Sequence, residues 1–251
     1  ALSGVMAAWT IQRLIGDGDP GMMTLALACI AAVLLCAAIG FLTGVMVTAF
    51  DIPAFIVTLA VMRIARGLAY KVAGGPSPIG IESTAFHSLS AGTLFGIPNP
   101  VILMVVLYIL AYVLMSHTAL GRYIYAVGGN PEAARLSGVP VKRVLLFVYA
   151  ICGAMAGVGG VMDASLFSVG NPNSGTGYEL QIIAAVVVGG TSLMGGKGKV
   201  VGTLIGALIL AVISNGMYLT KVDSYTQMIV FGTLILIAVL LDQLKAKRWA
   251  F

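Results

Sequence analysis

The stretch Met22–Ala49, MMTLALACIAAVLLCAAIGFLTGVMVTA, contains no charged side chain. About 20 consecutive apolar residues are enough for a helix to cross a bilayer, so this stretch predicts a membrane-spanning helix. Comparable apolar segments recur along the chain, at Ala1–Gln12, Ile52–Tyr70, Pro98–Met115, Val141–Met162, Tyr178–Met194, Val200–Leu219 and Tyr225–Leu241. We therefore expect an all-α polytopic membrane protein with about eight spans, forming a single transmembrane domain over residues 1–251.

Two of these segments are atypical. Ala1–Gln12 is only a partial span that begins at the first residue, so we expect the sequence to be N-terminally incomplete. Tyr178–Met194 is short and contains Gly189 and Gly190 near its end, and we expect it to enter the membrane without cleanly crossing it. Non-helical backbone at that depth is tolerated only where protein or a water-filled cavity surrounds it.

The overall composition excludes a soluble protein. Apolar residues make up 59% of the chain, charged residues make up 9%, and the mean hydropathy is +1.04. Soluble domains carry roughly 25% charged residues, so this chain has too few charges to cover a water-exposed surface. The three cysteines, Cys29, Cys36 and Cys152, lie in apolar segments, and we expect them to be reduced packing residues.

The distribution of positive charge predicts the orientation of the helices. Most of the 14 Lys and Arg residues fall in one set of alternate loops, which comprises Gly121–Arg143, Gly195–Lys199 and the tail after Leu241. The opposite set contains only Lys71 and Lys221 and comprises Gly16–Gly21, Lys71–Ile97, Asp163–Gly177 and Thr220–Ser224. Because cytoplasmic loops carry the excess of Lys and Arg, we expect the first set and the C-terminus to be cytoplasmic. Topology thus explains the net charge of +5, and nucleic-acid binding is not expected.

The polar stretch Gly121–Arg143, GRYIYAVGGNPEAARLSGVPVKR, carries the signals of a short helix. It supplies an N-cap, a proline at the first helical position, an acid in the first turn and a closing left-handed glycine, namely Asn130, Pro131, Glu132 and Gly138. These signals predict about two turns of helix over Pro131–Ser137, held outside the membrane. They fit a helix that docks on a partner and an ordinary structured connector equally well.

Glycines recur four residues apart inside three of the spans. The pairs are Gly40 with Gly44, Gly153 with Gly157, and Gly202 with Gly206. Small residues at this spacing let helix backbones approach closely in lipid. We therefore expect a compact helical bundle.

A few polar residues inside the spans are candidates for a translocation pathway. Ionisable residues in spans are functional by default, which makes Glu179 a candidate substrate ligand or proton carrier. A capping box between Thr176 and Glu179 is the simpler explanation of that residue. Gln181 lies deeper and has no capping role. Arg66, which shares a helix face with Arg63, either extends to the headgroups or lies at the external mouth of a pathway.

Neutral polar residues near the end of the seventh segment leave two interpretations open. Ser214 and Asn215 suit hydrogen bonding to a hydroxylated solute, and they suit contacts between helices equally well. Catalytic and metal sites are not expected, because His87 and His117 are isolated and no nucleophile motif occurs in the membrane. The loop Gly189–Lys199, GGTSLMGGKGK, does not match the spacing of a phosphate-binding loop.

Three stretches make the chain recognisable. Gly121–Gly138 (GRYIYAVGGNPEAARLSG), Gly175–Gly206 (GTGYELQIIAAVVVGGTSLMGGKGKVVGTLIG) and Ile52–Gly67 (IPAFIVTLAVMRIARG) closely resemble the ribose-type permeases of bacterial ABC importers. That family carries ribose, xylose, arabinose, galactose and autoinducer-2, and the ribose branch is the most similar in sequence. The resemblance covers essentially the whole chain. Arg63 stands where many relatives carry a neutral residue, so no role is transferred to it.

The resemblance implies a type II importer-like bundle with roughly ten spans in the full protein, in the bacterial inner membrane. It also implies two permease copies, expected to form a homodimer, around one pathway, cytoplasmic ATPase subunits that bind ATP and Mg²⁺, and a periplasmic sugar-binding protein. The short helix then matches the coupling helix that docks on the ATPase, with contact residues Asn130, Pro131, Glu132, Ala133, Arg135, Leu136 and Gly138. The pathway candidates are Glu179, Gln181, Ser214, Asn215 and Arg66.

The function implied is import of a monosaccharide by a permease subunit that catalyses no reaction and holds no cofactor itself. The alternative is a stand-alone secondary sugar transporter or facilitator. Such a protein is expected to contain buried ionisable residues for ion coupling. Only Glu179, Arg63 and Arg66 compete for that role, and each has a structural explanation.

Overall fold

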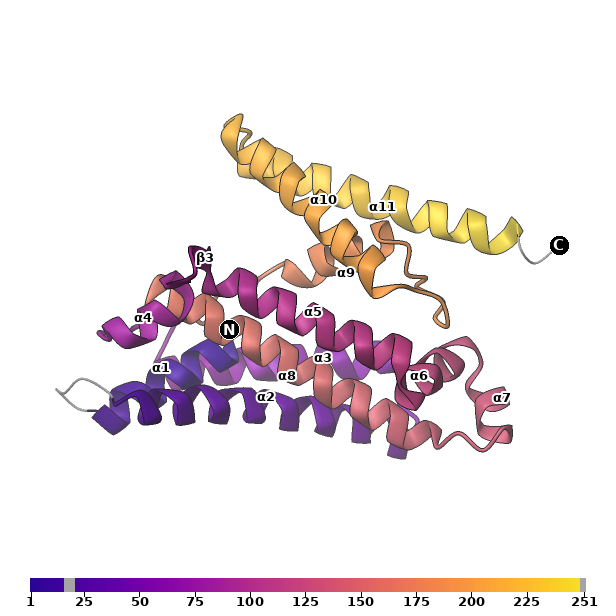
Figure 1. The fold of residues 1–251 in the computed structure, drawn as a ribbon, viewed down its shortest axis with the longest axis horizontal. Helices are drawn as coiled ribbons and strands as arrows, with labels where there is room; N and C mark the ends of the chain where they lie inside the picture. The colour runs from indigo at the N-terminus through magenta and orange to yellow at the C-terminus, as the bar shows by residue number, and fades with distance from the viewer. Residues whose placement is uncertain (16–20, 249–251) are drawn as a thin grey trace. The chain divides into compact units, whose positions relative to one another are not determined.

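The computed structural model of the chain describes residues 1–15 and 21–248 and is almost entirely helical (Figure 1). Contacts divide the chain into two compact units. The first unit comprises Ala1–Val106 and Lys142–Gly175, and the second comprises Leu107–Val141 and Thr176–Phe251. The expectation of one transmembrane domain stays a prediction.

The first unit is built from long helices with short strands at the ends of some of them. Its elements are α1 (Leu2–Ile15), α2 (Met22–Ala49), α3 (Ala54–Ala73), β1 (Ile79–Gly80), α4 (Thr84–Ala91), β2 (Thr93–Leu94), β3 (Ile97–Pro98), the start of α5 (Asn99–His117), most of α8 (Val141–Phe167) and β4 (Val169–Gly170). The second unit contains the end of α5, α6 (Ala119–Gly129), α7 (Pro131–Leu136), α9 (Tyr178–Val188), α10 (Val200–Leu219) and α11 (Ser224–Arg248).

Each predicted apolar segment forms a helix. Among the described residues, four helices are long and apolar enough to cross a membrane, namely α2, α5, α8 and α10. The helix α9 has only 11 residues and is about 16 Å long, which confirms that it is too short to cross a bilayer. Large apolar side chains remain exposed along these helices, and α5 buries none of its residues. Such surfaces require lipid or neighbouring helices around them.

The helices α2 and α8 of the first unit approach each other closely at their glycines. A Cβ atom at Gly153 would lie 3.1 Å from the Cα atom of Gly40, and one at Gly157 would lie 3.1 Å from the Cα atom of Val33. The predicted role of these glycines in close helix approach is therefore confirmed. The helix α1 packs in the same unit, where Val5, Ala7 and Ala8 are fully buried.

The loops predicted to lie on the external side are joined to one another. Strand β1 pairs with β4 in antiparallel register, with Ile79 opposite Gly170. The Tyr70 hydroxyl donates to Asn173 Oδ1 (2.6 Å), and the Ser165 hydroxyl donates to the Phe86 carbonyl (2.6 Å). These contacts confirm that Lys71–Ile97 and Asp163–Gly177 lie at the same end of the unit.

The segment Lys71–Ile97 is more ordered than a loop rich in Gly, Ser and Pro suggests. It contains the helix α4, whose N-cap Ser83 accepts a hydrogen bond from the Phe86 backbone N–H (3.2 Å). Phe86 is 1% exposed and anchors α4 in the core of the first unit. Burial of Phe86, together with the hydrogen bonds of Ser83 and Ser165, thus fixes a helix that composition alone does not reveal.

The second unit is organised around a close crossing of α9 and α10. A Cβ atom at Gly189 would lie 2.8 Å from the Cα atom of Thr203, and one at Gly206 would lie 2.7 Å from the backbone N of Gly189. Ala184, Ala185 and Leu210 form a buried cluster against which side chains of α11 pack. The predicted close approach at Gly202 and Gly206 is therefore confirmed.

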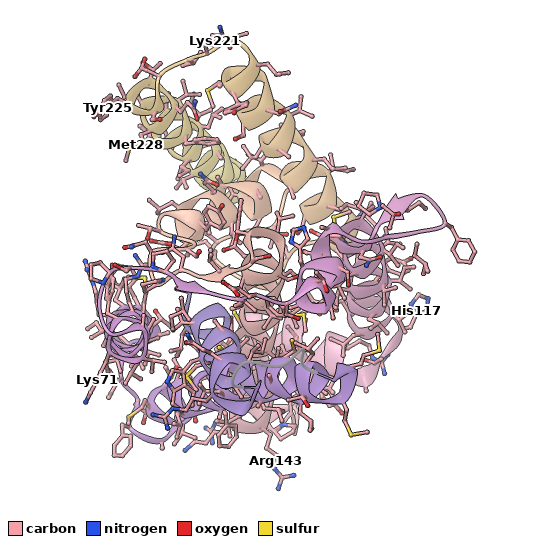
Figure 2. The ribbon with its side chains drawn as sticks, turned by 90° about the vertical axis from the view of Figure 1, so that its left-hand side faces the viewer. Lys71, His117, Arg143, Lys221, Tyr225 and Met228 are labelled. Atoms are coloured by element: carbon pink, nitrogen blue, oxygen red, sulfur yellow. The ribbon has the colours of Figure 1, made fainter. Side chains whose placement is uncertain are left out.

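The helix α11 begins after Asp223, which caps it. The carboxylate accepts from the Thr226 hydroxyl (2.7 Å) and from the Thr226 backbone N–H (2.9 Å). Figure 2 shows the neighbouring Lys221 and Tyr225 at the turn where α10 meets α11. These hydrogen bonds favour the charged form and hold the pKa of Asp223 below its usual value.

This cap predicts a pH-dependent contribution to stability. Because the folded pKa is depressed, the stabilisation is present above the ordinary aspartate pKa of about 3.9 and is lost as pH falls through the folded pKa. We expect an Asp223→Asn variant to unfold at a lower temperature than the wild type at pH 7. The difference between the two thermal unfolding midpoints should be smaller at pH 3 than at pH 7, because pH 3 lies below the ordinary aspartate pKa. A difference that is the same at both pH values would contradict this account.

Candidate coupling helix and pathway residues

The short helix α7 is capped at its N-terminus as predicted. The Asn130 side-chain oxygen accepts a hydrogen bond from the Ala133 backbone N–H (3.0 Å). Pro131 occupies the first helical position, and Glu132 lies in the first turn. The side chain of Asn130 therefore satisfies one of the N–H groups that a helix start leaves unpaired.

The C-terminal end of α7 is also closed. The helix ends at Leu136, with Ser137 as its C-cap, which is one residue earlier than predicted. Gly138 has a φ of +82°, and its N–H donates to the Arg135 carbonyl (3.0 Å). The Val139 N–H donates to the Ala134 carbonyl (3.0 Å), which completes a Schellman motif. The left-handed glycine predicted from the sequence is confirmed.

The surface of α7 combines an ion pair with an exposed leucine. Arg135 donates from Nε and from one terminal nitrogen to Glu132 Oε2, at 3.2 and 3.1 Å. Leu136 is 81% exposed, whereas Ala134 on the opposite side is 5% exposed. Ala133 is also exposed. One side of α7 is therefore held by the protein, and the other presents an apolar side chain beside two charges.

The helix α6, which leads into α7, was not predicted from the sequence. Its N-cap Thr118 accepts from the Gly121 N–H (3.2 Å), and Asn130 serves both as its C-cap and as the N-cap of α7. The short α7 stands at the end of α6 without an intervening linker (Figure 1). The threonine at the start of α6 was a usable sequence signal.

The loop between α9 and α10 contacts the end of α6. The Tyr125 hydroxyl donates to the Gly198 carbonyl (2.9 Å). Gly195 and Gly196 lie directly against Gly128 and Gly129. The predicted common side of Gly121–Arg143 and Gly195–Lys199 is therefore confirmed. The contact itself was not predicted, although the paired glycines in both segments were a sequence signal for it.

Two of the pathway candidates, Glu179 and Gln181, lie exposed near the start of α9. The predicted capping box is wrong, because α9 has Gly177 as its N-cap and no side chain caps it. Gly177 has a φ of +85°, so the chain enters the helix through a left-handed residue. Thr176 therefore lies one position too early to cap it. The capping explanation of Glu179 is thereby removed.

The remaining pathway candidates are divided between the two units. Ser214 is half-buried and Asn215 is exposed in the C-terminal half of α10. Gly189 meets Gly202, and Gly206 meets Ala185, so continuing this antiparallel register brings the start of α9 level with that half of α10. Arg66 is half-buried in α3 of the first unit. The second unit therefore collects Glu179, Gln181, Ser214 and Asn215 at one end of a helix pair.

The histidines and cysteines do not gather into a metal site in the part of the chain that the structure describes. His87 Nδ1 lies 3.0 Å from the Ser168 hydroxyl oxygen, and the His117 ring packs edge-on against Tyr112. Cys29, Cys36 and Cys152 are free thiols.

Comparison with known proteins identifies the family. The family described as "Branched-chain amino acid transport system / permease component" matches residues 1–239. The Ribose import permease protein RbsC of Escherichia coli (strain K12) is 45% identical over 98% of this chain and 75% of the relative. The D-allose transport system permease protein AlsC of the same strain is 36% identical over 98% of this chain and 73% of the relative.

A third relative covers less of the chain. The L-arabinose transport system permease protein AraH of Escherichia coli (strain K12) is 40% identical over 81% of this chain and 62% of the relative. No solved structure matches the chain significantly. The family match spans all four candidate membrane helices and α7. The chain is therefore a multi-pass membrane protein that belongs to the family of branched-chain amino acid transport system permease components.

Proposed function

We propose that the chain is the membrane permease subunit of an ATP-driven sugar importer, and that ribose or a related monosaccharide is its substrate. The observation that carries the proposal is similarity along nearly the whole chain to permeases named for ribose and allose. The capped helix α7 supports it, because it presents a rigid docking element beside the membrane helices.

The importer contains further subunits in this proposal. An ATPase subunit binds ATP and Mg²⁺, a periplasmic protein delivers the sugar, and a second permease copy completes the pathway. The permease lies in the bacterial inner membrane with its C-terminus and Gly121–Arg143 in the cytoplasm, where the excess of Lys and Arg is expected. It catalyses no reaction itself, and it transmits the closure of the ATPase into a movement of its helices.

The helix α7 is the contact with the ATPase. Leu136 inserts into an apolar depression of the ATPase, and the Glu132–Arg135 pair lies at the rim of that contact. Asn130, Pro131 and Gly138 hold the helix in shape through its caps, and Ala133 lies on its exposed surface. A stiff helix transmits force without first unfolding, so the caps serve coupling as well as stability.

The pathway requires only weak polar contacts, because the separate binding protein selects the sugar. Gln181, Ser214 and Asn215 offer amide and hydroxyl groups that suit a hydroxylated solute, and Glu179 lies in the first turn of α9. Arg66 lies in the other unit and is assigned to the external mouth of the pathway. A stand-alone secondary transporter is not favoured, because the relatives are named import or transport system permeases.

Reconstitution tests the proposal. The full-length permease, its cognate ATPase and its cognate binding protein are placed in proteoliposomes, and uptake of labelled ribose, arabinose and allose is measured with and without ATP. We expect ATP-dependent uptake of one of these sugars, with ATP hydrolysis stimulated by the loaded binding protein. Uptake by the permease alone that is indifferent to ATP would contradict the importer and favour the facilitator.

Exchanging the charges of Glu132 and Arg135 distinguishes a role in docking on the ATPase from a role in stabilising α7. We expect Arg135→Glu to impair coupling of ATP hydrolysis to uptake, because it breaks the pair with Glu132 and reverses a charge at the contact. The double variant Glu132→Arg with Arg135→Glu restores the internal pair but inverts the surface. Exposed pairs contribute only about 0.2–1 kcal/mol, so a docking role predicts that the double variant stays impaired. Full recovery of sugar uptake in the double variant would show that the pair acts only within α7.

A further inference from the structure

We propose that a glycine joint relays the movement of the coupling helix to α9 and α10. The joint comprises Tyr125 and Gly128 of α6 together with Gly195 and Gly196 of the loop that precedes α10. This inference rests on the proposed function, because it takes α7 to be the contact with the ATPase. It assigns a task to the glycine-rich loop that neither nucleotide binding nor sugar binding explains.

The two halves of the joint meet backbone to backbone. A Cβ atom at Gly128 would lie 2.8 Å from the backbone N of Gly196, and one at Gly196 would lie 2.6 Å from the Cα atom of Gly129. Real Cβ atoms do not approach backbone atoms this closely, so only glycine permits the contact. A side chain can relieve a close contact by changing its rotamer, whereas backbone atoms cannot. A displacement of α6 is therefore passed to the loop almost unchanged.

The loop half of the joint is internally braced. The Ser192 N–H donates to the Lys197 carbonyl (2.9 Å), and the Gly195 N–H donates to the Ser192 carbonyl (3.2 Å). Gly195 and Gly196 both adopt left-handed conformations, with φ of +88° and +72°. The hydrogen bond from Tyr125 to the Gly198 carbonyl holds the far side of the loop against α6. The loop therefore moves as one piece with α6.

The joint connects rigid elements on both sides. On one side, Asn130 ends α6 and begins α7, and its N–H donates to the Ala126 carbonyl (3.1 Å). On the other side, α10 begins at Val200, directly after the braced loop, and crosses α9 at Gly189. A displacement of α7 therefore reaches both helices that carry the pathway candidates of the second unit.

Four single substitutions test the joint. Gly128→Ala and Gly196→Ala force the backbones apart. Each has a matched control, because a Cβ at Gly129 would meet Gly196 only at an ordinary 3.8 Å, and one at Gly190 would meet nothing within 4 Å. Gly190 also shares the left-handed conformation of Gly196, with a φ of +84°, so Gly190→Ala reproduces the backbone strain without the contact.

The decisive measurement is ATP hydrolysed per ribose imported by the reconstituted complex. We expect Gly128→Ala and Gly196→Ala to raise this ratio on the order of tenfold, with hydrolysis retained, and we expect Gly129→Ala and Gly190→Ala to leave it near the wild-type value. A merely structural defect reduces the amount of active complex and lowers hydrolysis and uptake in proportion. An unchanged ratio in both joint variants would overturn the inference.

Hydrogen exchange on the permease alone separates this inference from the proposed function. Gly196→Ala should speed amide exchange in residues 191–199 and 126–134, and Gly190→Ala should not speed exchange in 126–134. Equal exchange in the two variants would refute the joint whichever sugar is carried. A wild-type complex that imports none of the tested sugars would contradict the proposed function, and the exchange comparison would still decide whether the joint exists.

Discussion

Replacing Leu136 by aspartate is expected to reduce ATP-driven sugar uptake by roughly ten- to a hundredfold. Leu136 is 81% exposed on α7, so it is available to an ATPase partner. Burying a leucine side chain contributes about 1.5–3 kcal/mol, and each 1.4 kcal/mol changes an association constant about tenfold. Aspartate loses that contribution and adds a charge that the apolar contact would have to desolvate. Uptake of labelled ribose into proteoliposomes, at fixed ATPase concentration, measures the effect.

The conservative variant Leu136→Met is the matched control. It preserves volume and apolar character, so we expect uptake close to that of the wild type. Because Leu136 is exposed in the permease alone, neither variant should change its thermal unfolding in detergent. An excess of ATPase should partly restore uptake by the aspartate variant, since the defect lies in association. Normal uptake by the aspartate variant at limiting ATPase would exclude Leu136 from the contact.

The sequence predicted α7 almost completely because its signals are local. Asn130 and Gly138 act on backbone groups within a few residues of themselves, so their roles follow from spacing alone. The role of the glycine pairs of α2 and α8 in close helix approach could also be predicted from the sequence, since small residues are favoured where helix backbones cross in lipid. The sequence did not predict which helices would cross at these glycines, because the packing partner of each helix depends on the whole bundle.

The errors arose where a tertiary contact or an alternative cap decides the local structure. Thr176 and Glu179 have the spacing of a capping box, but a left-handed Gly177 starts α9 after the threonine. The helix α4 depends on the burial of Phe86, and the glycine joint depends on two segments that are distant in sequence. The proposed roles of Arg66 and the other pathway candidates stay predictions, because function in a pathway depends on the assembled importer.

Placing leucine at Gly153 is expected to destabilise the packing of α8 against α2 in the first unit. A Cβ at this position would lie 3.1 Å from the Cα atom of Gly40 and equally close to the carbonyl carbon of Cys36. Overpacking a core commonly costs about 1–3 kcal/mol and sometimes more, and here the obstacle is the backbone of α2, which cannot change rotamer. We expect a loss of about 3 kcal/mol and a fall in the unfolding midpoint on the order of 10 °C.

The same substitution at Gly159 tests whether the loss of stability arises from the crossing of α2 and α8. Gly159 lies in the same helix α8 and is exposed, and a Cβ atom there would have no neighbour within 4 Å. A leucine there gains helix propensity over glycine and its Cβ atom meets no neighbour, so we expect folded protein at or above the wild-type level. Fluorescence-detected size exclusion and thermal unfolding in detergent compare the two variants. If Gly153→Leu and Gly159→Leu were equally stable, α2 and α8 would have to be held together by contacts other than their glycines.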